Sequence, residues 1–377
     1  MTLREPAGWE RGEAIPPNFH FRRGVGVGSR GIPVGLSAEQ FAVALSAYRL
    51  STPCGVYRLS VGACLYRLFS YHLKLKSMED TIMKFENIKG SIVALVTPFA
   101  RDGSVDFDAL TRLVEWHIEE GTDSILVLGT TGEYPTMSHE EDAAVVAHTI
   151  KVADGRVPIM VGSGSNCTAT QLAKSLEYEA MGADALLLIA PYYNKANPEG
   201  MYRHFMVTAE AVHTPCLLYN VPGRTGCSIP VPVVEKLAKH PNIVGIKEAS
   251  GDMGYIMKIA HLAGPDFALY SGNDDISIPL MSVGGSGIIS VFANVCPRMA
   301  HEITTDYLTG NQERALANHL KYLKFMNNLF IEVNPIPVKT AMNLAGLPGG
   351  TLRLPLCEMS EANEAILRAS MEEVGLL

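Results

Sequence analysis

The chain has 377 residues, of which 47% are hydrophobic and 19% charged, and its formal net charge at pH 7 is −8. A chain of this length can hold one α/β barrel of about 250 residues together with a smaller part. The apolar fraction excludes a disordered chain, and an acidic chain without a Lys/Arg-rich stripe is not expected to bind nucleic acid.

Seven cysteines are spread along the chain, at positions 54, 64, 167, 216, 227, 296 and 357. None has the close spacing of a zinc or redox site, so we expect no metal, no cofactor and a reducing, cytoplasmic setting. No stretch approaches the roughly 18 uninterrupted apolar residues of a membrane span, so no membrane partner is expected.

Residues 1–82 differ in composition from the rest of the chain. They hold 10 basic and 6 acidic side chains, a balance of +4, in Gly/Pro/Arg patches with one weakly apolar segment near 61–75. Three interpretations stay open: sequence translated upstream of a true start at Met78 or Met83, an organelle-targeting segment, or a genuine accessory segment. We expect an N-terminal extension that is disordered or absent from the mature protein.

From residue 91 onward, short runs rich in Val, Ile and Leu alternate with amphipathic stretches such as 107–120 and 169–181. Near-continuous apolarity is typical of parallel strands that are covered on both faces. The eight strands are expected at 91–97, 124–129, 158–162, 185–190, 216–221, 243–248, 268–272 and 287–292. Eight strand-helix units predict a closed (β/α)8 TIM barrel, with a doubly wound open sheet as the alternative.

After Pro297 the strand pattern stops and helical patterns take over. The expected helices cover 299–308, 312–330, 338–344 and 360–373. We therefore predict a catalytic barrel over 83–308 and a C-terminal helical domain over 309–377. Pro335 and Pro337 are expected to break the helical pattern before 338, because proline lacks the amide hydrogen.

Lys247 ends the apolar run of the sixth predicted strand, where a barrel carries its active site. Burial removes water from an ammonium group and lowers its pKa, so the neutral amine that attacks carbonyls becomes accessible near neutral pH. Alone, a lysine at a strand end is more often a surface side chain. Other polar residues that end strands at the same face therefore decide the interpretation.

Three of these strand ends carry residues suited to imine chemistry: 129–133 (Gly-Thr-Thr-Gly-Glu), 191–194 (Pro-Tyr-Tyr-Asn) and 219–226 (Tyr-Asn-Val-Pro-Gly-Arg-Thr-Gly). An imine-forming enzyme needs an amine, a proton shuttle and a grip on a carboxylate; lysine, tyrosine hydroxyls and Gly-Thr amides supply them. Taken singly, each feature has an ordinary interpretation. A buried tyrosine is usually a core residue, and Arg224 alone could be an ion-pair partner. The 129–133 loop alone could be a phosphate-binding loop or a tight turn.

Two further features have ordinary interpretations. Lys339, in Asn-Pro-Ile-Pro-Val-Lys (334–339), belongs to the helical part and is expected to be structural. Gly284, Gly285 and Gly287 invite a phosphate-binding interpretation, but they precede the eighth strand and so belong to the stability face of the barrel.

As an ordered set, the motifs at 129–133, 219–226 and 245–248 (Gly-Ile-Lys-Glu) resemble the dihydrodipicolinate synthase family, within the pyruvate-dependent class I aldolases. The resemblance runs from about Met83 to Leu377 and leaves the N-terminal segment unmatched. It implies that Lys247 forms a Schiff base with pyruvate. The enamine then attacks L-aspartate 4-semialdehyde, which begins the diaminopimelate route to lysine.

The resemblance also assigns roles to the other candidates. Tyr219 would shuttle protons at the imine, and Thr130 would relay them to Tyr193 of a neighbouring subunit. The remaining roles implied are Thr131 for the pyruvate carboxylate, Arg224 for the semialdehyde carboxylate, the backbone carbonyl of Ile289 for orientation, and Tyr192 for the subunit contact. The implied partner is a second copy of the chain, in a homotetramer built as a dimer of dimers.

Related lyases that act on sialic acid or sugar-derived keto acids share the lysine, so a pyruvate-releasing aldolase is the alternative. Arg224 favours the shorter partner, because sialic acid lyases typically lack an arginine there. A phosphate- or flavin-binding barrel and a non-catalytic scaffold are the alternatives from other classes.

In relatives that lysine inhibits, the allosteric pocket uses a small polar residue, two histidines, an Asn and a Glu. The corresponding positions here are Tyr134, His139, Asp142, Asn166 and Thr170, of which two match. We predict weak or absent feedback inhibition by lysine.

Overall fold

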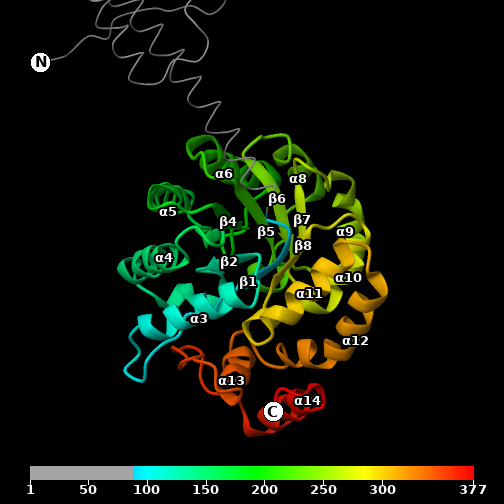
Figure 1. The fold of residues 1–377 in the computed structure, drawn as a ribbon. Coiled ribbons are helices and arrows are strands. Elements are labelled where there is room, and N and C mark those ends of the chain that lie inside the picture. The colour runs from blue at the N-terminus through cyan, green and yellow to red at the C-terminus, as the bar shows by residue number, and fades with distance from the viewer. Residues whose placement is uncertain (1–87) are drawn as a thin grey trace, which may run out of the picture. The chain divides into compact units, whose positions relative to one another are not determined.

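The computed structural model describes residues 88–377, so the predicted extension 1–82 lies outside the described residues. Eight parallel strands close into a barrel in chain order, with β8 beside β1 (Figure 1). The strands are β1 (Gly90–Ala94), β2 (Ser124–Val127), β3 (Ile159–Gly162), β4 (Ala185–Ile189), β5 (Cys216–Asn220), β6 (Ile243–Glu248), β7 (Ala268–Ser271) and β8 (Gly287–Ser290). The predicted TIM barrel is confirmed, and the open-sheet alternative is wrong.

Helices follow the strands and ring the barrel (Figure 1). They are α3 (Phe107–Glu119), α4 (His139–Ala153), α5 (Thr168–Met181), α6 (Pro198–Ala211), α7 (Pro222–Thr225), α8 (Val231–Leu237), α9 (Met253–Ile259), α10 (Ser277–Ser282) and α11 (Pro297–Leu308). Side chains fix where they begin. Asp106 accepts a hydrogen bond from the amide of Ala109 at the start of α3, and Ser138 with Glu141 forms a capping box on α4.

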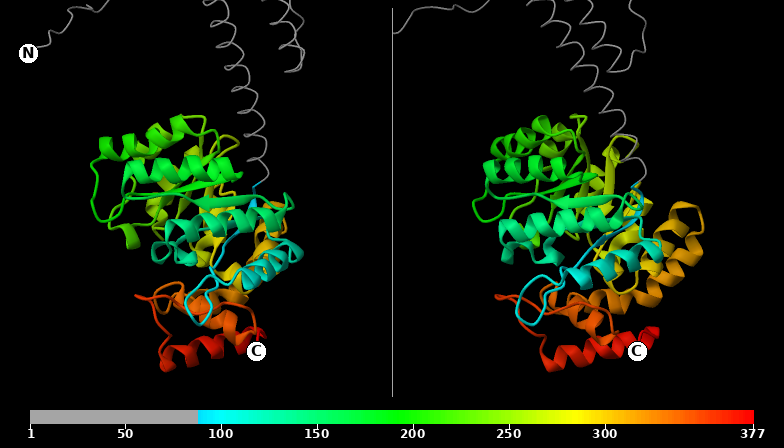
Figure 2. Two further views of the ribbon diagram at one scale, coloured as in Figure 1. Left: turned by 90° about the vertical axis from the view of Figure 1, so that its left-hand side faces the viewer. Right: turned by 60° about the vertical axis from the view of Figure 1, so that its left-hand side comes forward.

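Three more helices complete the chain: α12 (Gln312–Asn328), α13 (Ile336–Leu344) and α14 (Glu361–Val374). Both views in Figure 2 show α13 and α14 together below the barrel. The expected helix at 338–344 begins earlier than predicted, because Pro337 lies in the first turn of α13, where its missing amide hydrogen costs nothing. The proposed boundary between residues 308 and 309 stays a prediction.

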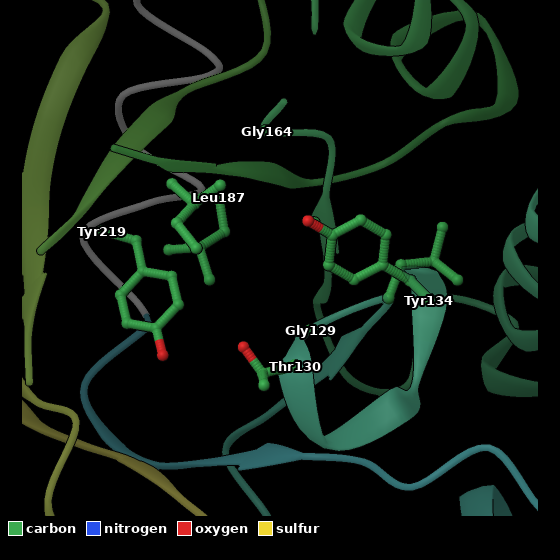
Figure 3. A pocket seen from close by; sticks show the side chains of 9 residues that line it. Gly129, Thr130, Tyr134, Gly164, Leu187 and Tyr219 are labelled. Carbon is green, nitrogen blue, oxygen red and sulfur yellow. The ribbon is translucent and has the colours of Figure 1, made fainter. Parts of the chain in front are cut away.

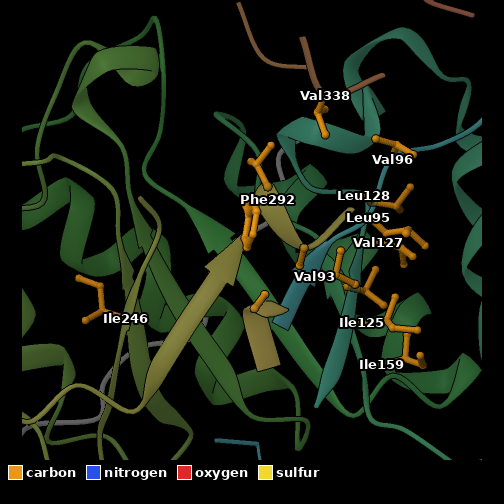
Figure 4. Packing of buried hydrophobic residues seen from close by; sticks show 14 of the residues in the cluster. Val93, Leu95, Val96, Ile125, Val127, Leu128, Ile159, Ile246, Phe292 and Val338 are labelled. Atoms are coloured by element: carbon orange, nitrogen blue, oxygen red, sulfur yellow. The ribbon is translucent and has the colours of Figure 1, made fainter. Parts of the chain in front are cut away.

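Alternate residues of the strands face two apolar layers. Ile92, Leu126 and Ile289 belong to a cluster inside the barrel, whereas Val93 and Val127 belong to the layer between strands and helices. Figure 4 shows this outer layer, which Val338 of α13 joins. Burying a Val or Leu side chain contributes about 1.5–3 kcal/mol, so both layers stabilise the barrel beneath the loops that follow its strands.

The barrel closes where Gly287 of β8 pairs with Gly90 of β1. Gly287 has a φ of +148°, and a Cβ there would lie 2.0 Å from the Gly90 carbonyl oxygen. Only glycine fits such an approach. This pairing is at the amino end of β8, which confirms the expected place of the glycines on the stability face. None of the helices formed by residues 88–377 is long and apolar enough to cross a membrane.

Candidate active site

A cavity of about 550 Å³ opens at the carboxyl ends of the strands. Five of the predicted residues line it: Thr130, Thr131, Tyr219, Arg224 and Lys247. They come from three different strand ends, so the barrel brings together side chains that are up to 117 positions apart (247 − 130). The cavity is also lined by residues 330–334, which lie between α12 and α13.

Lys247 lies near the end of β6, where it pairs with Tyr219 of β5. The lysine is only 6% exposed, and burial lowers the pKa of its ammonium to about 7. Two nearby charges act in opposite directions, since Asp274 raises this pKa and Arg224 lowers it. Gly272 leaves room for the side chain, because a Cβ there would lie 3.0 Å from Lys247 Cε. The structure therefore holds a buried amine with a lowered pKa at the cavity rather than in bulk water.

Asp274 is a functional candidate that the sequence analysis missed. Its carboxylate is buried and accepts hydrogen bonds from Ser290 Oγ at 2.6 Å and from the amides of Val291 and Phe292 at 3.1 Å each. Burial raises its pKa, and these three hydrogen bonds oppose the rise. A fixed carboxylate here counteracts the desolvation of the Lys247 ammonium. Asp274 could have been predicted, because it is one of the polar residues that directly follow β7.

Tyr219 places its phenol beside the Lys247 amine, whose Nζ lies 4.6 Å from the centroid of the tyrosine ring. Burial raises the pKa of this phenol, and its hydrogen bond with Thr130 and the charge of Arg224 oppose the rise. Figure 3 shows the hydroxyl groups of Tyr219 and Thr130 pointing toward each other. Together with Tyr134, these two residues line a small chamber of about 20 Å³. Such a pair of hydroxyls can pass a proton to and from a group bound at the amine.

Thr131 belongs to a short 3₁₀ turn, Thr130–Gly132, that follows β2. Its hydroxyl accepts a hydrogen bond of 3.0 Å from Asn334 Nδ2, and the carbonyl of Asn334 accepts one of 2.9 Å from an Arg224 Nη. Asn334 therefore joins the two residues predicted to hold carboxylates. Asn334 was not predictable from the sequence, because a residue in a Pro-interrupted helical segment gives no sign that the chain returns to the barrel mouth.

At the carboxyl ends of the two strands, a buried amide and carboxylate tie β5 to β6. Asn220 Nδ2 donates to Glu248 Oε2 at 2.7 Å, and the amide of Ser250 donates to Glu248 Oε1 at 2.6 Å. The amide of Ile229 in turn donates to Asn220 Oδ1 at 2.9 Å. Each of the two residues directly follows a predicted catalytic one in the chain. The network therefore fixes the relative positions of Tyr219 and Lys247.

Three predicted residues do not line the cavity. Tyr193 is 90% exposed and has a φ of +68°, which is rare for a tyrosine, and Tyr192 before it is half-buried. Ile289 is buried within β8, where it pairs with Ile92 of β1, and Val291 lines the cavity instead. The roles expected for all eight predicted residues stay predictions. Across residues 88–377, no three His, Cys, Asp or Glu side chains are grouped to hold a metal ion.

The model of the dihydrodipicolinate synthetase family matches residues 87–374. The chain belongs to this family. One relative is the 4-hydroxy-tetrahydrodipicolinate synthase of Clostridium perfringens (strain SM101 / Type A), which is 48% identical over 289 residues, 77% of this chain and 99% of that protein. Curated members of the family from other bacteria reach similar identity, such as 49% over 290 residues for Thermoanaerobacter pseudethanolicus, which span 77% of this chain and 97% of that protein.

Solved structures of family members share the fold. The chloride-inhibited dihydrodipicolinate synthase from Acinetobacter baumannii, complexed with pyruvate, is 44% identical, with a TM-score of 0.74 over 77% of this chain and all of that one. A variant described as the first monomeric dihydrodipicolinate synthase is 40% identical, with a TM-score of 0.75 over 78% of this chain and 99% of that one. The family resemblance predicted from the motifs is thus confirmed.

Proposed function

We propose that the chain is a 4-hydroxy-tetrahydrodipicolinate synthase, a lyase that condenses pyruvate with L-aspartate 4-semialdehyde in lysine biosynthesis. The observation that carries this proposal is the buried Lys247 amine, with a pKa of about 7, beside the phenol of Tyr219. Relatives with 48% identity bear this activity in their name, and one solved relative holds pyruvate. The reaction requires no cofactor, because the lysine itself activates the keto acid.

In the first half of the reaction the neutral Lys247 amine attacks the C2 carbonyl of pyruvate. The carbinolamine loses water to give an iminium, with Tyr219 supplying and removing protons and Thr130 relaying them. Thr131 holds the pyruvate carboxylate through its hydroxyl and backbone amide, and the carbonyl of Ile289 orients the keto acid. Loss of a C3 proton from the iminium then gives the nucleophilic enamine.

In the second half the enamine carbon attacks the aldehyde of the semialdehyde and forms the new C–C bond. Arg224 holds the carboxylate of this second substrate, since a guanidinium binds a carboxylate through two parallel hydrogen bonds. The amino group of the substrate then attacks the iminium carbon, closes the ring and releases Lys247. One water leaves for each pair of substrates, which balances the condensation.

We also propose that the active enzyme is a homo-oligomer, a tetramer built as a dimer of dimers. Tyr193 is almost fully exposed in the single chain, which suits a hydroxyl that completes the Thr130 relay of a neighbouring subunit, with Tyr192 at the contact. One solved relative is described as the first monomeric variant of a dihydrodipicolinate synthase, which suits a family whose members are usually oligomers. The five cysteines among residues 88–377 are free, which suits a cytoplasmic enzyme.

The test is a coupled assay with pyruvate and L-aspartate 4-semialdehyde, in which a dihydrodipicolinate reductase oxidises its nicotinamide cofactor as the product forms. We expect turnover that requires both substrates. The comparison arm adds N-acetylneuraminate alone and follows the release of pyruvate. Pyruvate release without condensation would replace the proposal by the related aldolase activity.

A further inference from the structure

Glu133 connects the Thr130–Gly132 turn to the C-terminal helices. It follows the turn directly, and its amide donates to the carbonyl of Thr130 at 3.1 Å. The residue has a φ of +55°, in the left-handed region. A glutamate pays a conformational cost there that glycine would not, and such residues persist only where surrounding contacts hold them.

The contacts that hold Glu133 come from α13 and from the segment that follows it. Lys339 Nζ lies 2.5 Å from Glu133 Oε1, and the side chains of this ion pair are 1% and 0% exposed. The second carboxylate oxygen, Oε2, accepts the amide of Arg353 at 3.1 Å. Lys339 also donates to the carbonyl of Thr351 at 2.8 Å, and its Nζ lies 4.5 Å from the centroid of the Phe99 ring after β1. A single ammonium thus joins the barrel mouth to the C-terminal helices.

Arg353 makes a second contact between the barrel and the C-terminal part of the chain. The guanidinium of Arg353 donates to the carboxylate of Glu141 on α4 and to the carbonyls of Gly103 and Thr136. It also lies 4.1 Å from the centroid of the Phe99 ring. The side chain of Arg353 therefore docks its segment on the barrel independently of Glu133, which only the Arg353 backbone amide contacts. Lys339 supplies the side-chain contact with the residue that ends the turn.

The mechanism described above gives no role to either member of the buried pair. Burying two charges is expensive, and a pair of apolar residues of the same size would often hold two helices together as well or better. What an apolar pair would not do is fix the orientation of a carboxylate that belongs to a strained residue. That residue ends the turn from which Thr130 faces Tyr219 and Thr131 lines the cavity.

We propose that Lys339 and Glu133 form a positioning pair for the Thr130–Gly132 turn, so that the C-terminal helices set the affinity of the barrel for pyruvate. This inference rests on the proposed function. Neither residue touches substrate. The ion pair holds the left-handed backbone of Glu133, and that backbone places Thr130 and Thr131.

The test compares Lys339→Met, Glu133→Gln and the double variant with wild type by steady-state kinetics in both substrates. We expect each single variant to raise the KM for pyruvate about tenfold, with the KM for the semialdehyde within about twofold of wild type. In the double variant no buried charge lacks its partner, so the rise should be smaller than the product of the two single effects. The matched control is Lys324→Met, which breaks the exposed pair of Lys324 with Glu373 between α12 and α14 and should leave both KM values unchanged.

Near-UV circular dichroism and melting temperature establish folding for each variant. If a single variant fails to fold, the KM for pyruvate of the double variant tests the inference. A folded variant that melts earlier but keeps the wild-type KM for pyruvate would overturn the inference and leave a purely structural pair. A wild-type protein that captures no pyruvate would instead contradict the proposed function itself.

Discussion

The buried Lys247 should make the protein less stable than it would be without it. The folded state holds this ammonium with a pKa of about 7, against a value of 10.5 for the ordinary side chain. A tenfold change in proton affinity corresponds to about 1.4 kcal/mol, so the difference between these two pKa values corresponds to about 5 kcal/mol of stability lost at low pH. Lys247→Met keeps the apolar stem and removes the charge. We therefore expect this variant to be more stable than wild type.

The pH dependence of the difference follows from proton linkage. Between pH 7 and 10.5 the unfolded chain binds more protons at this position than the folded one, so wild-type stability rises with pH across that window. The penalty is complete below pH 7. The advantage of Lys247→Met should thus be largest, up to about 5 kcal/mol, at pH 6 and should shrink toward pH 10.

Urea unfolding at a series of pH values measures this difference. Lys324→Met is the matched control, because Lys324 is exposed and its removal should change the free energy of unfolding by less than about 1 kcal/mol. A Lys247→Met variant that is no more stable than wild type, or whose advantage does not vary with pH, would refute the reasoning that the amine is held neutral by burial.

Three more predictions concern the substrates, the subunits and regulation. Arg224→Leu should raise the KM for the semialdehyde by about 100-fold, as loss of a charged carboxylate contact does, while borohydride trapping of pyruvate persists; loss of both would place Arg224 elsewhere in the mechanism. Tyr193→Phe and Lys247→Ala should each be nearly inactive alone, yet regain activity when their subunits are mixed and reassembled, and mixtures that stay inactive would contradict a shared site. Sub-millimolar L-lysine should leave the rate unchanged, because Asp142 already holds the ammonium of Lys174 at 2.6 Å, and a clear drop in rate would show otherwise.

Much of the barrel was predictable because its strands are covered on both faces and read as continuous apolar runs. The ends of the strands were less so. The first strand was expected at 91–97 but ends at Ala94, and the last was expected to reach 292 but ends at Ser290. Apolar residues beyond each end stay buried although they lie outside the strands, so hydrophobicity alone does not mark where a strand stops.

The candidate site divides in a similar way. Lys247, Tyr219 and Arg224 were predictable, because each lies at or just after a strand end and every strand end meets at one rim. Asn334 and Glu133 were not, since their partners lie 203 and 206 positions away in the chain (334 − 131 and 339 − 133). Such contacts depend on how the C-terminal helices return over the barrel mouth, which no local pattern encodes.

Capture of pyruvate by Lys247 is the central claim, and borohydride reduction followed by peptide mapping measures it directly. Treating the protein with pyruvate and borohydride should add one reduced pyruvyl group, and the modified peptide should carry it on Lys247. The Lys339→Met variant should still be labelled on Lys247, whereas the Lys247→Ala variant should not be labelled at all. An unmodified Lys247 peptide, or a label on another lysine, would contradict the account.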